Sequence, residues 1–227
     1  MKEKKLFYCE AAYAVGTITL ALGTALMEKA NFGLSMVVAP AYLLHLKVSE
    51  ILPFFSFGVA EYAFQAIVLI ILSLVMRRLK RAYFLSFATA IIYGTVLDLM
   101  IWAVSLFPYT GMLWRLLFYI SGLVICAIGV AFFFRSYFPP AAYELFVKEI
   151  SAKYNAQVSK TKTIYDCCSC VLAIVLSLLF FGRLTGIGWG TIACALVNGY
   201  LIGKICNYMD KSFNFEDAFP LRAMFEQ

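Results

Sequence analysis

The sequence is poor in charged residues and in histidine, and it lacks the motifs of several common enzyme classes. Only 14% of its 227 residues are charged, whereas soluble domains contain about 25%, so an ordinary soluble protein is excluded. The single histidine, His45, excludes a metal site built from several histidines. No G-x-x-x-x-G-K-[ST], H-E-x-x-H or G-x-S-x-G motif is present. We therefore expect no enzyme, no cofactor and no metal, with an intramembrane enzyme the least favoured function.

Apolar residues are what the chain has in abundance. They make up 63% of the sequence, and the mean hydropathy is +0.85. A bilayer core requires roughly 20 apolar residues per helix, which predicts an all-α, polytopic membrane helix bundle that forms one domain over residues 1–227. A glycine-rich break, GRLTGIGWG at 182–190, leaves a five-span alternative with one re-entrant segment. The predicted spans are about 7–27, 51–76, 82–106, 114–135, 164–182 and 187–207.

The basic residues predict the orientation of this bundle. With the N-terminus inside, most lysines and arginines fall on the inner side, including Lys160 and Lys162 in the loop before the fifth span. The positive-inside rule then places both termini on the cytoplasmic side of a cell membrane, which we expect to be a bacterial plasma membrane. Orientation also accounts for the net charge of +6, so we expect the lipid bilayer and no nucleic acid as partner. The outer side receives Lys29, Lys47, Arg115 and Arg183.

Two long loops are not purely polar. Residues 31–47 are too short to span and are expected to form an interfacial or re-entrant segment on the outer side. Residues 138–160 predict an amphipathic helix on the inner surface, with an ordinary loop as the alternative. The apolar face of that helix is Leu145, Phe146, Ile150 and Tyr154.

Seven cysteines lie in or beside apolar segments, and three of them belong to the run Cys167-Cys168-Ser169-Cys170. The run has no second cysteine pair and no histidine nearby. We expect small, polarizable side chains at a helix contact, with a redox or metal site as the alternative.

The two halves of the sequence resemble each other at a nearly constant offset of 104 to 106 residues. Each half, about 7–106 and 114–207, holds three spans, and an odd number makes the second half enter the membrane from the opposite side. The sequence therefore predicts two inverted three-helix repeats, an arrangement common in secondary transporters. The matching pairs are 13–27 with 119–133, 71–76 with 175–180, and Gly94 with Gly199.

Three segments resemble the YczE/YitT-like family of bacterial integral membrane proteins: ALGTALMEKANFGLS, FPPAAYELFVKEISAKYNAQVSKTKTIYD and GIGWGTIACALVNGYLIG. The resemblance covers nearly the whole chain, and it implies a membrane fold with transport as the expected activity. Many members of that family carry a proline–aromatic–acid step after the first helix. Here GLSMVVAP departs from that step, while AAYEL in the second half keeps the pair Tyr143-Glu144.

Five polar residues inside the spans are the candidate site. A charged side chain at a helix centre costs about 2.5–3.5 kcal/mol, so such a residue should face the bundle interior or water. Glu61 lies at mid-depth with Gln65 one turn later, and Asp166 is its approximate symmetry mate. We expect Glu61 and Asp98 to converge on a midplane cavity and bind a cation or exchange a proton, with Asn198 as a further polar group. The alternative is that each residue only joins neighbouring helices by hydrogen bonds.

The glycine break at Gly186, Gly188 and Gly190 is the last candidate. Irregular backbone at membrane depth is tolerated only where it is buried or lines a cavity, so these glycines are expected either to line the candidate cavity or to permit close helix packing. Together these features predict a secondary transporter or permease of an unidentified small metabolite, coupled to protons through the carboxylates. The alternative is a non-transporting membrane scaffold or helper that binds a partner. A homo-oligomer or a membrane partner is a further expected association.

Overall fold

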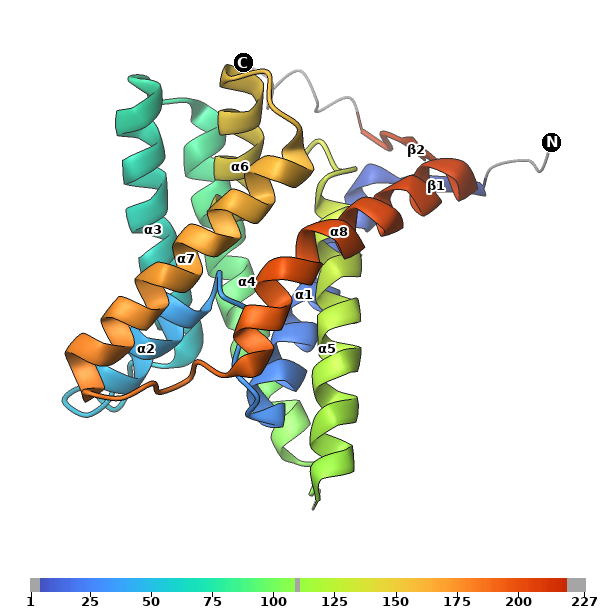
Figure 1. Ribbon diagram of the computed structural model, residues 1–227. Helices are drawn as coiled ribbons and strands as arrows, with labels where there is room; N and C mark the ends of the chain where they lie inside the picture. The colour runs from blue at the N-terminus through green and yellow to red at the C-terminus, as the bar shows by residue number, and fades with distance from the viewer. Residues whose placement is uncertain (1–4, 109–110, 220–227) are drawn as a thin grey trace.

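The chain forms a bundle of helices, and the computed structural model describes residues 5–108 and 111–219 (Figure 1). Six of its helices are long and apolar enough to cross a membrane, which confirms the prediction of a polytopic all-α membrane bundle. The break at 182–190 separates two complete helices, as the six-span reading requires. The elements are β1 (Lys5–Tyr8), α1 (Cys9–Ala30), α2 (Ala39–Val48), α3 (Phe57–Met76), α4 (Arg81–Ser105), α5 (Met112–Phe133), α6 (Ala142–Lys153), α7 (Val158–Phe181), α8 (Trp189–Ser212) and β2 (Phe213–Glu216).

Local sequence sets several helix ends. Ser56 caps α3, and its side chain accepts a hydrogen bond from the backbone N–H of Val59 at 3.1 Å. At the other end of α3, Arg77 adopts the left-handed conformation. The helix α7 stops at Gly182, whose φ of +65° suits a residue without a Cβ. These caps fix where the long apolar runs begin and end.

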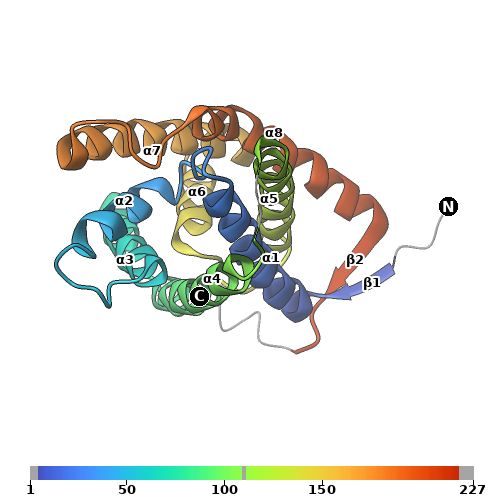
Figure 2. The same ribbon diagram turned by 90° about the horizontal axis from the view of Figure 1, so that it is seen from below.

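The helices α1 and α5 form the centre of the bundle and lie side by side (Figure 2). Their contact is antiparallel, since Gly16 lies against Gly129 and Gly23 lies against Gly122. A methyl group on Gly23 would lie only 2.6 Å from the backbone nitrogen of Cys126. Small residues therefore allow these two backbones to approach closely, as they do in other membrane helix pairs.

The order of long and short helices is the same in the two halves of the chain, α1 to α4 and α5 to α8. The short helices pack across the halves, with α2 on α7 and α6 on α3. At the sequence offset of 106, Gly16 corresponds to Gly122 and Gly23 corresponds to Gly129. The Gly16–Gly129 contact is therefore equivalent to the Gly23–Gly122 contact. A two-fold relation between the halves produces such reciprocal contacts. The geometry thus favours the inverted repeat, which stays a prediction.

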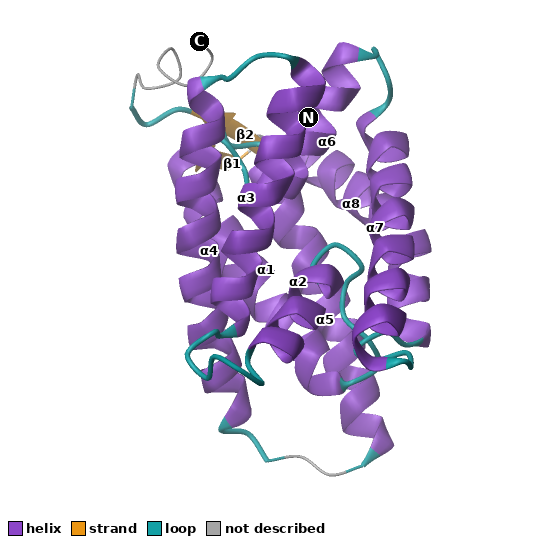
Figure 3. Cartoon of the chain, turned by 90° about the vertical axis from the view of Figure 1, so that its left-hand side faces the viewer, coloured by secondary structure: helices purple, strands orange, loops and turns teal. Residues whose placement is uncertain are grey.

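The two strands bring the described ends of the chain together. β1 and β2 pair in parallel, and the carboxylate of Glu10 accepts hydrogen bonds from the backbone of Ala218 and Phe219 at 3.0 Å. We call the end of the bundle that carries β1 and β2 the terminal end. Figure 3 shows α6 near the same end and the carboxyl end of α4 at the opposite one.

The position of α6 differs from the prediction, which placed this helix on the inner surface of the membrane. The predicted segment was 138–160, whereas the helix covers only Ala142–Lys153. Ala142, Tyr143, Glu144 and Leu145 are buried, and Tyr154, just after the helix, is 65% exposed. The first turn of α6 therefore enters the bundle among α3, α4 and α7. The reason is that the Ala142 backbone N–H and the Glu144 carboxylate find polar partners inside the protein, as described next.

Candidate functional site

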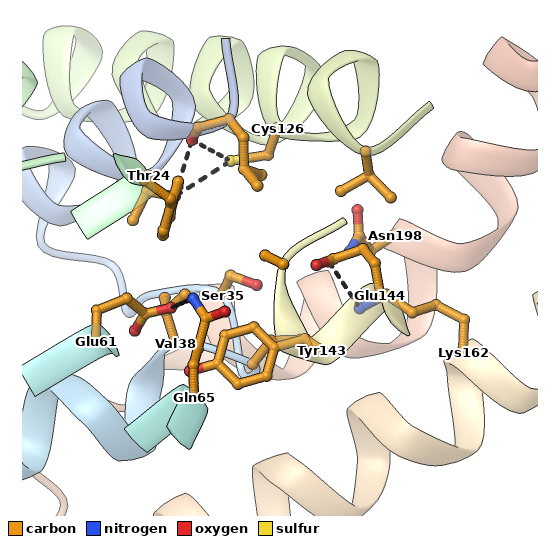
Figure 4. A pocket seen from close by; sticks show the side chains of 15 residues that line it. Thr24, Ser35, Val38, Glu61, Gln65, Cys126, Tyr143, Glu144, Lys162 and Asn198 are labelled. Carbon is orange, nitrogen blue, oxygen red and sulfur yellow. Dashed lines mark hydrogen bonds and ion pairs between the residues drawn. The ribbon is translucent and has the colours of Figure 1, made fainter. Parts of the chain in front are cut away.

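A small enclosed cavity lies between the two halves of the chain. Its volume is about 30 Å³, which is room for about two water molecules. Both α3 of the first half and α6, α7 and α8 of the second half contribute polar side chains to its wall (Figure 4). Its polar lining residues are Thr24, Ser35, Glu61, Gln65, Tyr93, Tyr143, Glu144, Lys162 and Asn198.

Glu61 and Gln65 form the side of the cavity that belongs to α3. Neither side chain is exposed. The Gln65 amide nitrogen donates to Glu61 Oε1 at 3.3 Å, and its oxygen accepts the backbone N–H of Ala142, the first residue of α6, at 2.8 Å. Glu61 Oε2 has no hydrogen bond of normal geometry among the described residues, but the Tyr143 hydroxyl lies close enough to interact with this carboxyl group. Gln65 thus ties the two halves together beside a carboxylate that keeps acceptor capacity.

A buried lysine lies on the opposite side of the cavity. Lys162, in the first half of α7, is 2% exposed. Its ammonium group lies 2.9 Å from Asp166 Oδ1, one helical turn later, and 4.0 Å from Glu144 Oε1 on α6. Asn198 on α8 interacts with the same Asp166 carboxylate. Three helices of the second half therefore meet at one ion-paired group.

The carboxyl groups of this cluster outnumber its lysine. Glu61, Glu144 and Asp166 are all buried, and Lys162 is the one cation that pairs with any of them among the described residues. Uncompensated buried charge costs several kcal/mol per ion. Burial raises the pKa of Glu144 above its usual range, and the neighbouring Lys162 offsets this only in part. The cluster therefore has the composition to take up protons or a cation.

The structure brings together most of the predicted site residues, but Asp98 lies elsewhere. Glu61, Gln65 and Asn198 line the cavity, and Asp166 stands directly behind Lys162. Asp98 instead accepts hydrogen bonds from the Ser56 hydroxyl at 2.5 Å and from the Gly58 N–H at 2.8 Å. It therefore joins α4 to the start of α3 and does not share the Glu61 cavity.

The glycine break also lies outside this cavity. Gly188 and Gly190 pack against the loop at Phe32, where the Gly190 N–H donates to the Phe32 carbonyl at 3.1 Å. Gly186 lines a separate cavity of about 120 Å³ toward the opposite end, beside Glu28. Gly188 and Gly190 therefore permit close packing, which was the alternative prediction. Gly186 lines a cavity, but that cavity is not the one that contains Glu61.

Sequence reasoning placed Lys162 in a cytoplasmic loop, and the structure corrects this. The helix α7 begins at Val158, six residues before the predicted span, so Lys162 belongs to its second turn. The available signal was the spacing of Lys162 and Asp166, since residues four apart share one face of a helix. Glu144 was noted only through the family resemblance, and its role beside Lys162 follows from the structure.

Comparison with known proteins gives a family but no activity. Residues 8–207 match the family model described as "Family of unknown function (DUF6198)". No curated protein and no solved structure matches the chain. The match does not test the resemblance to the YczE/YitT-like proteins, which stays an expectation.

Proposed function

The chain belongs to the DUF6198 family, and we propose that it is a secondary transporter of a small solute, coupled to protons through the buried carboxyl groups. The observation that carries the proposal is the enclosed cavity between the halves, lined by Glu61, Glu144 and Lys162. Intramembrane ionisable groups that face a bundle interior are typical of ion and substrate pathways. Sites between the repeats are typical of secondary transporters.

The two ends of the bundle differ in a way that suits alternating access. At the end opposite the terminal end, Asp98 holds α3 and α4 together, and the backbones at Gly58 and Gly94 are in contact. In the second half the position that corresponds to Asp98 at an offset of 105 is Gly203, which has open space around it. An open cleft lies there, and Lys162 lines both that cleft and the enclosed cavity. This asymmetry supports the proposal of a carrier that is closed at one end and accessible from the terminal end.

Proton coupling follows from the charge imbalance of the cluster. With all groups ionised, the carboxylates carry more charge than Lys162 can neutralise. A solute that changes the charge near Lys162 changes the cost of ionising Glu61 and Glu144, because charges a few ångströms apart interact strongly away from water. Solute binding and proton binding are therefore thermodynamically linked.

Proteoliposomes that enclose a pH-sensitive dye test the proposal. Sets of amino acids, carboxylates, sugar phosphates and amines are added outside, and luminal pH is followed for each set. A transporter moves protons with at least one set, and Glu61→Gln abolishes that movement. Glu50→Gln is the matched control, since Glu50 is an exposed residue paired with Lys47 outside the cluster.

A scaffold or helper gives a different result in this assay. It moves no protons with any set, although the reconstituted protein is folded and correctly inserted. Solute-dependent proton movement that is unchanged in Glu61→Gln would remove this residue from the coupling mechanism.

A further inference from the structure

The cleft at the terminal end is basic and leads to the buried cluster. Its volume is about 790 Å³, and it lies among the ends of α5 and α8, the first turn of α7 and one face of α6. Lys162 forms part of its wall while remaining 2% exposed, so this side chain separates the open cleft from the enclosed cavity. A solute that enters by this route meets an ammonium group first.

The other charged groups of the cleft wall are cations. Arg135, Lys148 and Lys204 line it, and no carboxylate does among the described residues. Arg135 is neutralised by Asp210, at 2.6 Å. Lys148 and Lys204 are exposed, and neither forms an ion pair with any described acid. The cleft therefore keeps an excess of positive charge, which concentrates anions.

The start of α7 adds backbone donors to the same wall. Gln157, Val158 and Ser159 line the cleft, and Gln157 provides no side-chain cap. The first N–H groups of a helix have no partner within it, and the positive end of the helix dipole favours an anion there. The long helix α7 thus points its N-terminal end into a cleft that already has basic side chains and ends on a buried lysine.

We propose that the transported solute is a small oxyanion, a carboxylate or a phosphate, which enters this cleft and binds Lys162 in place of Asp166 and Glu144. The inference rests on the proposed transport function and names its substrate class. The basic rim attracts the anion, the start of α7 and Lys162 bind it, and the neighbouring acids determine when binding occurs.

The acids make anion binding depend on protonation. An oxyanion beside Glu144 and Asp166 is repelled while both are ionised, and the repulsion falls when the cluster takes up a proton. Anion affinity therefore rises as pH falls, and the proton travels with the anion. The titratable groups that face the cluster are Glu61 on α3, Tyr93 on α4, Cys126 on α5, Tyr143 and Glu144 on α6, Lys162, Tyr165 and Asp166 on α7, and Cys194 on α8.

Cys206 reports on the cleft because it lines the wall and is partly exposed. The full chain in phosphatidylcholine nanodiscs is treated with neutral iodoacetamide, and modification of Cys206 is quantified by peptide mass spectrometry. Acetate, succinate and inorganic phosphate are added in turn, with ionic strength held constant by sodium chloride. At least one should slow modification about tenfold at a concentration about ten times its Kd, and more strongly at pH 5.5 than at pH 8.

Variants separate the binding site from a general charge effect. Lys162→Gln should remove the protection, and Lys204→Gln on the exposed rim should weaken it without a loss of folding. Lys47→Gln, at the opposite end of the bundle, should leave it unchanged. Protection that survives Lys162→Gln, or protection by none of the three anions at either pH, overturns the proposal.

A lipid headgroup could supply the same chemistry, so its contribution is measured separately. The experiment is repeated in nanodiscs that contain phosphatidylglycerol and no added anion. Protection by this lipid alone would overturn the assignment to a soluble solute. If the liposome assay finds proton movement only with amines or neutral solutes, the substrate class is wrong and the transport function stands. If anions protect Cys206 but no solute moves protons, the anion site stands and the transport function is wrong.

Discussion

At the scale of single residues, Lys162 has the largest structural consequence. Replacing it with glutamine leaves Glu144 and Asp166 buried without their cation, and breaking a buried ion pair on one side costs about 3–5 kcal/mol. We expect Lys162→Gln to lower the thermal unfolding temperature clearly, measured by fluorescence-detected size exclusion after heating. Lys47→Gln removes an exposed pair and should cost less than about 1 kcal/mol.

The double variant Lys162→Gln/Asp166→Asn checks the cause of that loss. It removes both the cation and the charge that needs it, so it should regain part of the unfolding temperature lost in the single variant. Equal loss in the single and double variants would show that the ion pair is not the source of the effect.

The sequence reveals some of these residues and not others for a physical reason. Glu61, Gln65 and Asn198 stand out because polar groups in apolar runs must find an interior environment, and all three line the cavity. Lys162 lies near the start of its helix, where hydropathy does not define the boundary, so it resembled a loop residue. Asp98 is an acid in an apolar run, as Glu61 is. Its hydrogen-bond partners, however, depend on how α4 packs on α3, and hydropathy carries no information on that packing.

At the scale of helices, the α1–α5 contact predicts a sharp difference between glycines. Gly23→Ala places a methyl group 2.6 Å from the Cys126 backbone nitrogen and 2.7 Å from the Gly122 carbonyl oxygen, and both are backbone atoms that move little. We expect a loss of about 1–3 kcal/mol of stability from overpacking, detected as a lower unfolding temperature. Gly203→Ala, where nothing lies within 4 Å, should leave the unfolding temperature unchanged or higher.

Helix packing also predicts what Asp98 does. Asp98→Ala removes the acceptor for the Ser56 hydroxyl and the Gly58 N–H, and the loss of hydrogen bonds to a charged group costs about 1.5–3 kcal/mol. The variant should be less stable and should open the contact between α3 and α4. In proteoliposomes the number of protons moved per solute should stay as in the unaltered chain, since Asp98 is outside the Glu61 cavity. A changed ratio would restore Asp98 to the coupling site.

The element pattern was the most predictable level of this structure. The order of spans and the short helices between them follow from apolar length and from breaks such as the one after Gly182, and all six expected spans are helices. The depth of α6 was not predictable, because Tyr143 and Glu144 are polar and only their partners, Glu61 and Lys162, make their burial favourable. Helices can thus be found from one segment, whereas a site requires contacts between segments.

At the scale of the whole molecule, the paired strands require both described ends of the chain to lie on one side of the membrane. β1 and β2 join residues 5–8 to 213–216, and six spans return the chain to its starting side. Lys148 and Lys204, which form no ion pair with an acid of the described part of the chain, lie toward the same end. Because basic residues near span ends stay in the cytoplasm, we infer that this end, with the basic cleft, faces the cytoplasm.

Reporter fusions test this orientation. Green fluorescent protein fused to the C-terminus should fluoresce, and alkaline phosphatase fused there should be inactive, because the two reporters mature on opposite sides of a bacterial plasma membrane. Insertion of the phosphatase between α4 and α5 should give an active enzyme. The reverse pattern would turn the cleft outward, and the anion that we assign to it would then arrive from outside the cell. That result would change the direction of access and leave the contacts of Lys162 as they are.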